Sequence, residues 1–267
     1  MLAGCGIVFF ASCNNGAPAD NKAAGLAPVA LAAVPASPDF AGATLGIQSV
    51  TAIKIGTDSA KVTFNFDVKN YELKSQTADK DTKLCSNSDK GQHIHFILDN
   101  APYKALYEPT NDVTLAKNTE HYLMAFLSRS YHESVKSQGA AVIYHFKIDE
   151  NGELKKLEDP AGPMLFYSRP KGDYIGKDTA NVLLDYYVWN GTLAPDGYKV
   201  KTVILRPMSD PFVVTSDKWE SHFIQNLGTG KVKVMIQLVD KDGHLVDSMH
   251  NSIVREINLA ASEPLKK

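Results

Sequence analysis

Cysteine is scarce in this chain. Three cysteines occur among 267 residues, and two of them, Cys5 and Cys13, lie within the first thirteen positions. Cys85 therefore stands alone in the body of the protein, which excludes a disulfide framework and a CxxC metal or redox motif there. Because Cys85 lies in a polar stretch, we interpret it as an ordinary loop thiol.

Motifs of well-known enzyme classes are also absent. The sequence contains no P-loop, dinucleotide-binding fingerprint, EF-hand loop or GxSxG nucleophile elbow. Ser130 and Ser134 lie on either side of His132, but adjacency in sequence is not the geometry of a nucleophile and its base. We therefore expect a protein that is not an enzyme.

A strong charge of either sign is missing too. Lys and Arg number 28 against 30 Asp and Glu, which gives a formal net charge of −2 at pH 7. Without a global basic field, the chain is not expected to bind nucleic acid. With 44% hydrophobic residues, it can bury one large core or two small ones.

A short apolar segment occupies residues 1–13, and it is too short to span a bilayer. Its small residues before Cys13 predict a signal peptide, although no Lys or Arg precedes Lys22. The run Phe10-Ala11-Ser12-Cys13 resembles the lipobox of bacterial lipoproteins, in which the cysteine is diacylated. The alternative, Leu2-Ala3-Gly4-Cys5, leaves no room for an apolar segment before it, so Cys13 is the expected lipidation site.

Large apolar residues are almost absent from residues 14–44, where Ala, Pro, Gly, Asn and Asp prevail. Such a segment cannot bury enough surface to offset its ordering entropy, so we predict a disordered, flexible tether. Lipobox and tether together are typical of a Gram-negative envelope lipoprotein. We therefore expect an outer-membrane lipoprotein, facing the periplasm or the cell surface, with the membrane as a partner through the lipid anchor.

Alternating apolar and polar residues dominate the body of the chain from Leu45 onward, and long helical patterns are scarce. Residues 45–158 form the first expected domain, because Asp159-Pro160-Ala161-Gly162-Pro163 marks a boundary. Its expected strands are Gly46–Ile55, Lys61–Tyr71, Gln92–Leu98, Tyr122–Leu127 and Ala141–Ile148.

The second half, residues 159–267, repeats this plan. Val182–Trp189 mirrors Val62–Lys69, Lys199–Leu205 mirrors His93–Asp99, and Val232–Leu238 mirrors Tyr122–Leu127, with Ile253–Leu259 closing the unit. Each unit has about the size of an immunoglobulin-like sandwich. We therefore predict an all-β fold of two tandem immunoglobulin-like β-sandwich domains. The Cys…Trp…Cys signature is absent, and a single large jelly roll is the alternative.

Histidines gather in the first unit. On a strand, His93 and His95 point to the same face, and such an HxH pair can present two imidazoles to Zn or Cu. His121 and His132, and also His145, could converge with them if neighbouring strands align. We therefore name His93, His95, His121 and His132 as candidate metal ligands, with Zn or Cu as the candidate cofactor.

Two other interpretations of these histidines remain open. They could form the solvated polar face of a half-buried strand, or line a pocket for an organic ligand. The aligned positions of the second unit are Lys199, Lys201 and Lys231, none of which is a plausible metal ligand at neutral pH. The fold therefore does not require imidazole there.

Serine and arginine adjoin where two strands are expected to run into loops. One run contains Arg129, Ser130 and His132, and the other contains Arg169 and Lys171. A guanidinium offers a planar donor fork to phosphate or carboxylate, so these residues are candidate ligand-binding residues for a small anion. In the alternative interpretation, Arg129 pairs with Glu133 or a backbone carbonyl and holds its loop.

Three runs carry a family resemblance: His93–Tyr103, Phe126–Ser134 and Leu165–Gly172. In this order they resemble a group of lipoproteins from Bacteroidota-type bacteria that are often labelled phosphopeptide-binding proteins. The resemblance covers most of residues 45–260. The resemblance implies Arg129, Arg169 and Lys171 as phosphate contacts, with His132 assisting when protonated.

The sequence thus favours a non-catalytic, lipid-anchored binding protein of the cell envelope whose ligand is open. The first alternative is a Zn- or Cu-binding protein that uses the first-domain histidines. The second is recognition of an anion or phosphopeptide by the Ser-Arg loops. A protein, a peptide or a small anionic molecule is the expected partner.

Overall fold

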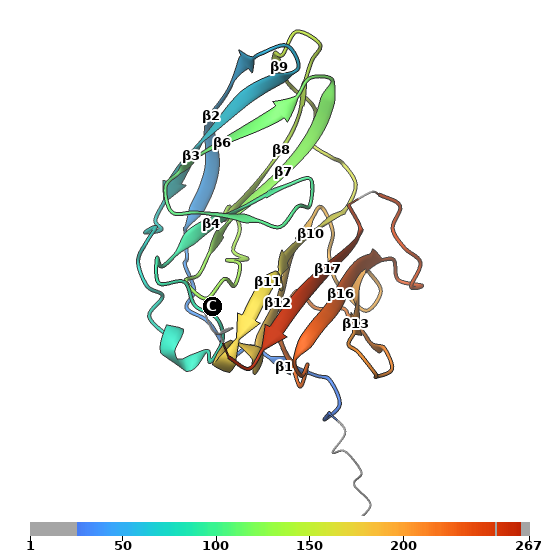
Figure 1. The fold of residues 1–267 in the computed structure, drawn as a ribbon. Helices are drawn as coiled ribbons and strands as arrows, with labels where there is room; N and C mark the ends of the chain where they lie inside the picture. The colour runs from blue at the N-terminus through green and yellow to red at the C-terminus, as the bar shows by residue number, and fades with distance from the viewer. Residues whose placement is uncertain (1–25, 249, 263–267) are drawn as a thin grey trace, which may run out of the picture.

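The computed structural model describes residues 26–248 and 250–262, and about half of these residues lie in strands of four sheets (Figure 1). The prediction of an all-β fold is confirmed. Within the described ranges, no helix is long and apolar enough to cross a membrane. The expected signal peptide, with Cys5 and Cys13, lies outside the described residues.

Eight strands build the first half of the body: β2 (Thr44–Ile55), β3 (Ser59–Lys69), β4 (His93–Leu98), β5 (Lys104–Leu106), β6 (Thr110–Ala116), β7 (Thr119–Ser128), β8 (Ala141–Ile148) and β9 (Leu154–Lys156). They form one sheet of order β2-β3-β6 and a second of order β5-β4-β7-β8-β9. Alternate residues point into the space between the sheets, as Phe64 of β3 and Phe96 of β4 do. The two sheets therefore enclose one core as a β-sandwich.

The second half repeats the sandwich with β10 (Met164–Arg169), β11 (Gly172–Ile175), β12 (Val182–Trp189), β13 (Lys199–Leu205), β14 (Phe212–Ser216), β15 (His222–Gln225), β16 (Gly230–Val239) and β17 (Ser252–Ala260), joined by β1 (Ala30–Ala33). The sheet orders are β1-β15-β12-β10 and β11-β17-β16-β13-β14. All pairs are antiparallel except β11 with β17. A second core, including Val200, Val234 and Ile257, lies between these sheets.

The strand order is the same in both halves. The orders β2-β3-β6 and β5-β4-β7-β8 of the first correspond to β10-β12-β15 and β14-β13-β16-β17 of the second. Strand β4 lies between β5 and β7, as β13 lies between β14 and β16, so the histidines and the mirrored lysines occupy equivalent places. Two separate cores contradict the alternative of a single jelly roll.

Residues 26–43 depart from the expected tether. Strand β1 pairs antiparallel with β15, with Leu31 opposite Ile224, and Leu31 packs against the core of the second sandwich. The chain then passes back to the first sandwich, where Ala43 is buried. The prediction of a disordered tether over residues 14–44 is therefore wrong for this part, because Val29 and Leu31 supply the apolar anchors that a composition average hides. Residues 14–25 lie outside the described residues.

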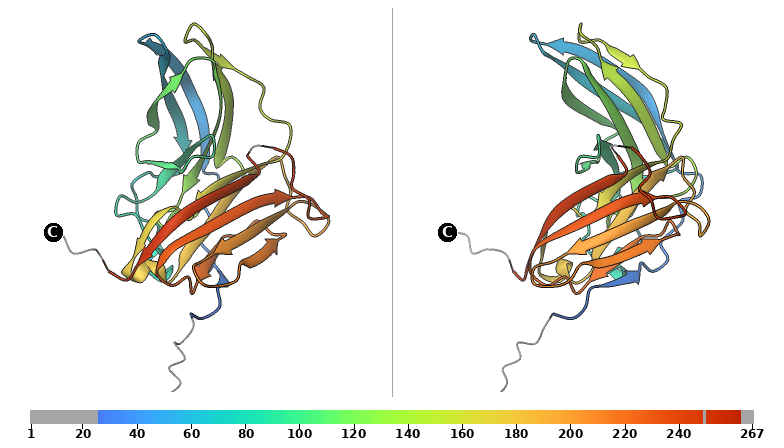
Figure 2. Two further views of the ribbon diagram at one scale, coloured as in Figure 1. Left: turned by 45° about the vertical axis from the view of Figure 1, so that its right-hand side comes forward. Right: turned by 90° about the vertical axis from the view of Figure 1, so that its right-hand side faces the viewer.

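A third apolar cluster joins the two sandwiches. It combines Ile97, Met124 and Phe126, from the outer face of the β4–β7 sheet, with residues of β10 and β12. Phe126 stacks on Tyr187 with ring centroids 5.2 Å apart. The two sandwiches lie side by side (Figure 2), and this cluster buries a face of β4 that a separate sandwich would expose.

Candidate functional site

Strand β4 sends its two histidines to the boundary between the sandwiches. Ile94 and Phe96 alternate with them and belong to the first core, so His93, His95 and Ile97 face outward. Because the second sandwich covers this face, both histidines have no exposed surface. The interpretation of His93 and His95 as a solvated polar face is therefore wrong.

His132 reaches the same place from the loop between β7 and β8. The loop is closed by hydrogen bonds from Arg129 N to Glu133 O and from His132 N to Arg129 O, both 2.9 Å long. His132 has φ of 71°, a left-handed conformation that few non-glycine residues adopt. Side chains held in such conformations are frequent at functional sites. The turn places the His132 ring beside that of His93, with centroids 5.0 Å apart.

The three imidazoles converge on one atom, Nε2 of His93. It lies 3.0 Å from Nε2 of His95 and 3.1 Å from Nδ1 of His132. One nitrogen from each ring thus lies within 4.8 Å of the others, and only 8% of His132 is exposed. Three buried imidazole nitrogens this close together are a donor set that suits Zn or Cu.

Partners of the other ring nitrogens orient two of the histidines. His93 Nδ1 lies 2.8 Å from the carbonyl oxygen of Gly91 and must donate to it, which leaves the electron pair on Nε2. His95 Nδ1 lies 3.0 Å from Oγ of Ser168, which belongs to the second sandwich. Gly91 has φ of 82°, and a Cβ there would lie 2.2 Å from the carbonyl oxygen of Lys74, so this position requires glycine.

Tyr103 and two cations complete the surroundings. The Tyr103 ring stacks on His95 with centroids 3.5 Å apart, and its hydroxyl lies 3.1 Å from His132 Nδ1. Lys171 Nζ lies 3.7 Å from the centroid of the same ring, and the Arg169 guanidinium carbon lies 5.4 Å from it. Burial raises the pKa of the Tyr103 phenol, so the phenol is neutral at pH 7.

Burial lowers the pKa of all three imidazoles. The pKa of His93 falls to about 4, and the pKa values of His95 and His132 lie well below their ordinary value. The charges of Arg169 and Lys171 add to the effect. Burial, with help from Arg169, also lowers the pKa of Lys171 to about 8. At pH 7 the imidazoles are therefore neutral, as metal ligation requires, while Lys171 is mostly charged.

His121 and His145 do not join this cluster. His121 Nδ1 lies 2.7 Å from Oδ2 of Asp99, and its Nε2 lies 2.7 Å from Oγ1 of Thr119. His145 Nε2 lies 2.8 Å from Oε1 of Glu120. The prediction of His121 as a metal ligand is therefore wrong, because its two nitrogens serve local contacts at the far end of β7.

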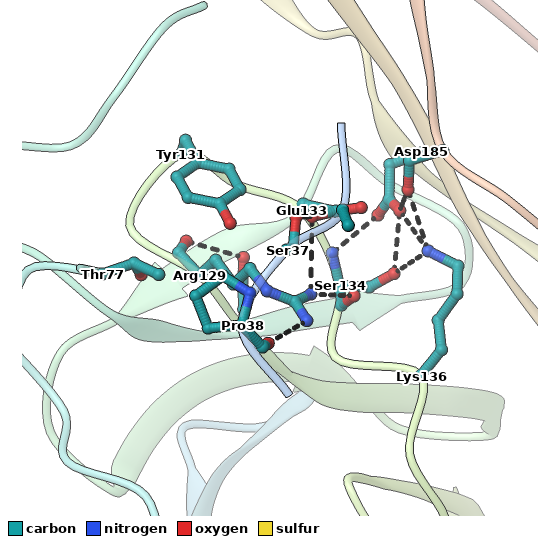
Figure 3. Close-up of polar contacts among 12 residues, drawn as sticks. Ser37, Pro38, Thr77, Arg129, Tyr131, Glu133, Ser134, Lys136 and Asp185 are labelled. Atoms are coloured by element: carbon teal, nitrogen blue, oxygen red, sulfur yellow. Dashed lines mark hydrogen bonds and ion pairs between the residues drawn. The ribbon is translucent and has the colours of Figure 1, made fainter. Parts of the chain in front are cut away.

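Arg129, expected to contact an anion, is occupied by contacts within the chain (Figure 3), and so is Ser130. The Arg129 guanidinium donates to the carbonyl oxygens of Ser134 at 2.9 Å and Pro38 at 2.7 Å, and it lies 3.5 Å from Glu133. Ser130 is fully buried, and its Oγ accepts the Thr77 amide. The contacts match the alternative in which Arg129 holds its own loop.

Ser134 belongs to a buried polar cluster that also joins the sandwiches (Figure 3). Its Oγ donates to Asp185 at 2.8 Å and accepts Lys136 Nζ at 2.6 Å, while Lys136 also lies 2.7 Å from Asp185. In the described ranges, no hydrogen bond joins His132 to Ser130 or Ser134. The three residues thus do not form the nucleophile and base that their adjacency could suggest.

Several residues of the site carry no signal that the sequence alone reveals. Tyr103 and Ser168 lie in the runs that carry the family resemblance, but their roles depend on how the sandwiches pack. Arg255 of β17 donates to the carbonyl oxygens of Ser168 at 2.8 Å and Ala101 at 3.2 Å. It thereby holds both sides of the boundary beside the histidines.

No protein-family model and no curated protein sequence matches the chain. Among solved structures, it is similar to fibronectin(III)-like modules of Clostridium thermocellum CbhA, at 11% identity over 82% of this chain and 95% of that one, with a TM-score of 0.27. It is also similar to the extracellular domain of a B. thetaiotaomicron protein described as a hybrid two-component system, at 10% identity over 80% of this chain and 38% of that one, with a TM-score of 0.28. Likenesses this weak say nothing about what this chain binds.

Proposed function

We propose that this chain is a metal-binding protein of the cell envelope in which His93, His95 and His132 hold one Cu or Zn ion. The observation that carries the proposal is the convergence of three buried, neutral imidazole nitrogens on one point, with distances of 3.0 and 3.1 Å from His93 Nε2.

Without a metal, this arrangement leaves an electron pair poorly matched. His93 Nε2 has one electron pair, because its Nδ1 donates to Gly91. It can accept a hydrogen from His95 or from His132, but not from both. If His95 donates to it, Nδ1 of His132 can accept from the Tyr103 hydroxyl, 3.1 Å away, but the electron pairs of His132 Nδ1 and His93 Nε2 still face each other at 3.1 Å in a buried site, which costs free energy. A shared metal ion satisfies all three nitrogens at once.

The spacing is close to what a metal needs. Zn–N bonds of about 2.0–2.1 Å in tetrahedral geometry separate ligand nitrogens by about 3.3–3.4 Å. The two distances from His93 Nε2, 3.0 and 3.1 Å, are within a few tenths of an ångström of that value, and the third nitrogen pair lies within 4.8 Å. The contacts of Gly91 and Ser168 to the opposite ring nitrogens are of the kind that fixes ligating histidines.

The test is metal content and affinity. We expect chelator-treated protein to bind one Cu or Zn per chain in calorimetry. His93→Ala, His95→Ala and His132→Ala should each lose binding, and Ser168→Ala should weaken it by about 10–100-fold. His121→Ala is the matched control and should bind like the wild type. No metal uptake by the wild type, or equal uptake by His93→Ala, contradicts the proposal.

The proposal also covers the cellular location of the chain and the fold type of each sandwich. Each half is proposed to be an immunoglobulin-like module, carried by a chain that is lipidated at Cys13 and retained at the outer membrane. The support is the lipobox and the repeated sandwich order. Metabolic labelling with a palmitate analogue should tag the wild type and not Cys13→Ser; equal labelling of the two contradicts the anchor.

A further inference from the structure

The metal site lies beside a concentration of positive charge. Lys171 Nζ lies 3.7 Å from the Tyr103 ring centroid, and His95 stacks on that ring at 3.5 Å. A stacked ring leaves no room for an ammonium on the same face, so Tyr103 separates Lys171 from His95 by one ring thickness. The Arg169 guanidinium carbon lies 5.4 Å from the same ring centroid. A third cation, Arg255, has its guanidinium carbon 4.4 Å from the Tyr167 ring centroid and donates to the Ser168 carbonyl oxygen.

These cations have no acidic partner in the part of the chain that the structure describes. Lys171 donates to the carbonyl oxygen of Tyr103, Arg169 to the hydroxyl of Tyr174, and Arg255 to the carbonyl oxygen of Ser168. Only 8% of the Arg169 surface is exposed, and its Nε has no hydrogen-bond partner among the described residues. The positive charge near the histidines is therefore not neutralised by a carboxylate of the described residues.

From this distribution of charge we infer that the site selects the monovalent cuprous ion over divalent ions; the inference rests on the proposed function. The ligands are three neutral imidazoles, so a bound ion keeps its full charge. Repulsion from Lys171 and Arg169 is twice as large for a dication as for a monocation at the same place. Because the site is buried, salt and water screen this repulsion only weakly. The difference in repulsion therefore lowers the affinity for a dication more than the affinity for a monocation.

The coordination number favours the same ion. The cluster offers three nitrogen ligands, whereas Zn sites almost always have four ligands, the fourth being a protein group in structural sites and a water or substrate in catalytic ones. Imidazole is a suitable ligand for copper, and three neutral nitrogens suffice for the cuprous ion. A divalent ion would need a further ligand, and an anion would be the natural one in these surroundings.

The experiment measures both ions on the full chain at pH 7. Chelator-treated protein is titrated anaerobically with Cu(I) against bicinchoninate, and with Zn(II) against a pyridylazo dye. We expect one Cu(I) per chain, bound at least about 1,000-fold more tightly than Zn(II). Equal affinities overturn the inference but leave the proposed function intact. Absence of both metals, by contrast, removes the proposed function itself.

Removing one positive charge gives a second, independent readout. Lys171→Gln keeps a donor for the Tyr103 carbonyl but loses the charge. If it raises Cu(I) affinity about fivefold, it should raise Zn(II) affinity about 25-fold, because the logarithm of the gain doubles with ionic charge. Lys199→Gln is the control: it removes an equal charge from β13, the strand of the second sandwich that corresponds to β4. It should change neither the Cu(I) affinity nor the Zn(II) affinity. Circular dichroism checks that both variants are folded.

Two outcomes contradict charge selection directly. Equal gains for Cu(I) and Zn(II) in Lys171→Gln would show that the lysine acts through packing rather than charge. The second outcome is Zn(II) affinity that rises to the Cu(I) value when phosphate is added to the wild type. That result would show that the cations exist to recruit an anion as a further metal ligand. Unchanged Zn(II) affinity with phosphate supports the inference.

Discussion

His132 combines a strained backbone conformation with a side chain of the proposed metal site. Its φ of 71° costs free energy for a residue with a Cβ, and the cost is offset by the closed loop around it. The same loop fixes Arg129, whose guanidinium binds the Ser134 and Pro38 carbonyl oxygens. Arg129 therefore contributes to the site by holding the turn that presents His132.

Cys85 allows a test of burial at a single residue, independent of metal. Burial raises the pKa of its thiol to about 12, against about 8.5 for an unfolded cysteine. Because thiolate increases with pH, alkylation should rise about tenfold per pH unit from pH 7 to 10 without a plateau. At pH 8 it should be at least about 100-fold slower than in urea.

The measurement is iodoacetamide labelling of a chain that carries Cys5→Ser and Cys13→Ser, so that Cys85 is the one thiol. Adding Cys85→Ser gives the blank. A plateau near pH 9 in the folded protein would mean that the thiol has an ordinary pKa and is not held in a dry environment.

At the scale of elements, strands with strict alternation could be predicted closely from the sequence. Val182–Trp189 and Lys199–Leu205 coincide with β12 and β13, and the expected repeat of the strand order is present. Short strands such as β1 and β15 could not be predicted, because four residues carry too little periodicity. Strand β1 depends on pairing with β15, nearly two hundred residues away in the sequence, and β15 lies between β1 and β12.

Strand β1 supplies a prediction at this scale. Leu31 is partly buried against the second core, so Leu31→Asp should destabilise the protein by about 2 kcal/mol. Leu26, 56% exposed, gives the matched control, and Leu26→Asp should cost less than about 0.5 kcal/mol. Urea unfolding measures both changes. Equal stabilities of the two variants would mean that β1 adds nothing to the sheet.

At the scale of the whole molecule, the packing of the two sandwiches decides the site. The sequence places His93 and His95 on one face of a strand, and this is how they lie. Whether that face meets water or protein depends on the neighbouring sandwich, which delivers Ser168, Arg169 and Lys171. For the same reason, His121 could not be distinguished from His132 by spacing alone: one is at the far end of β7, and the other follows its near end.

The ion pair across the boundary is predicted to hold the sandwiches together. Asp185 is 1% exposed and accepts Lys136 at 2.7 Å. Asp185→Asn should destabilise the protein by about 2–4 kcal/mol, because it leaves a largely buried ammonium without its counter-charge. The double variant with Lys136→Met should recover at least about 1 kcal/mol of that loss.

Urea unfolding of the single and double variants gives this coupling energy. The exposed pair of Lys156 and Asp159 is the control, and Asp159→Asn should cost less than about 1 kcal/mol. Additive effects of Asp185→Asn and Lys136→Met would show that the two side chains act independently.

The position of β1 also sets an order of events during synthesis. Its partner β15 follows it by about 190 residues along the chain, so β1 has no neighbour to pair with until most of the protein has been made. The first sandwich, whose strands are all complete by Lys156, can form meanwhile. The histidine cluster is closed only when Ser168 and its neighbours arrive with the second sandwich. Metal capture is therefore expected to be a late step, after the whole chain has emerged.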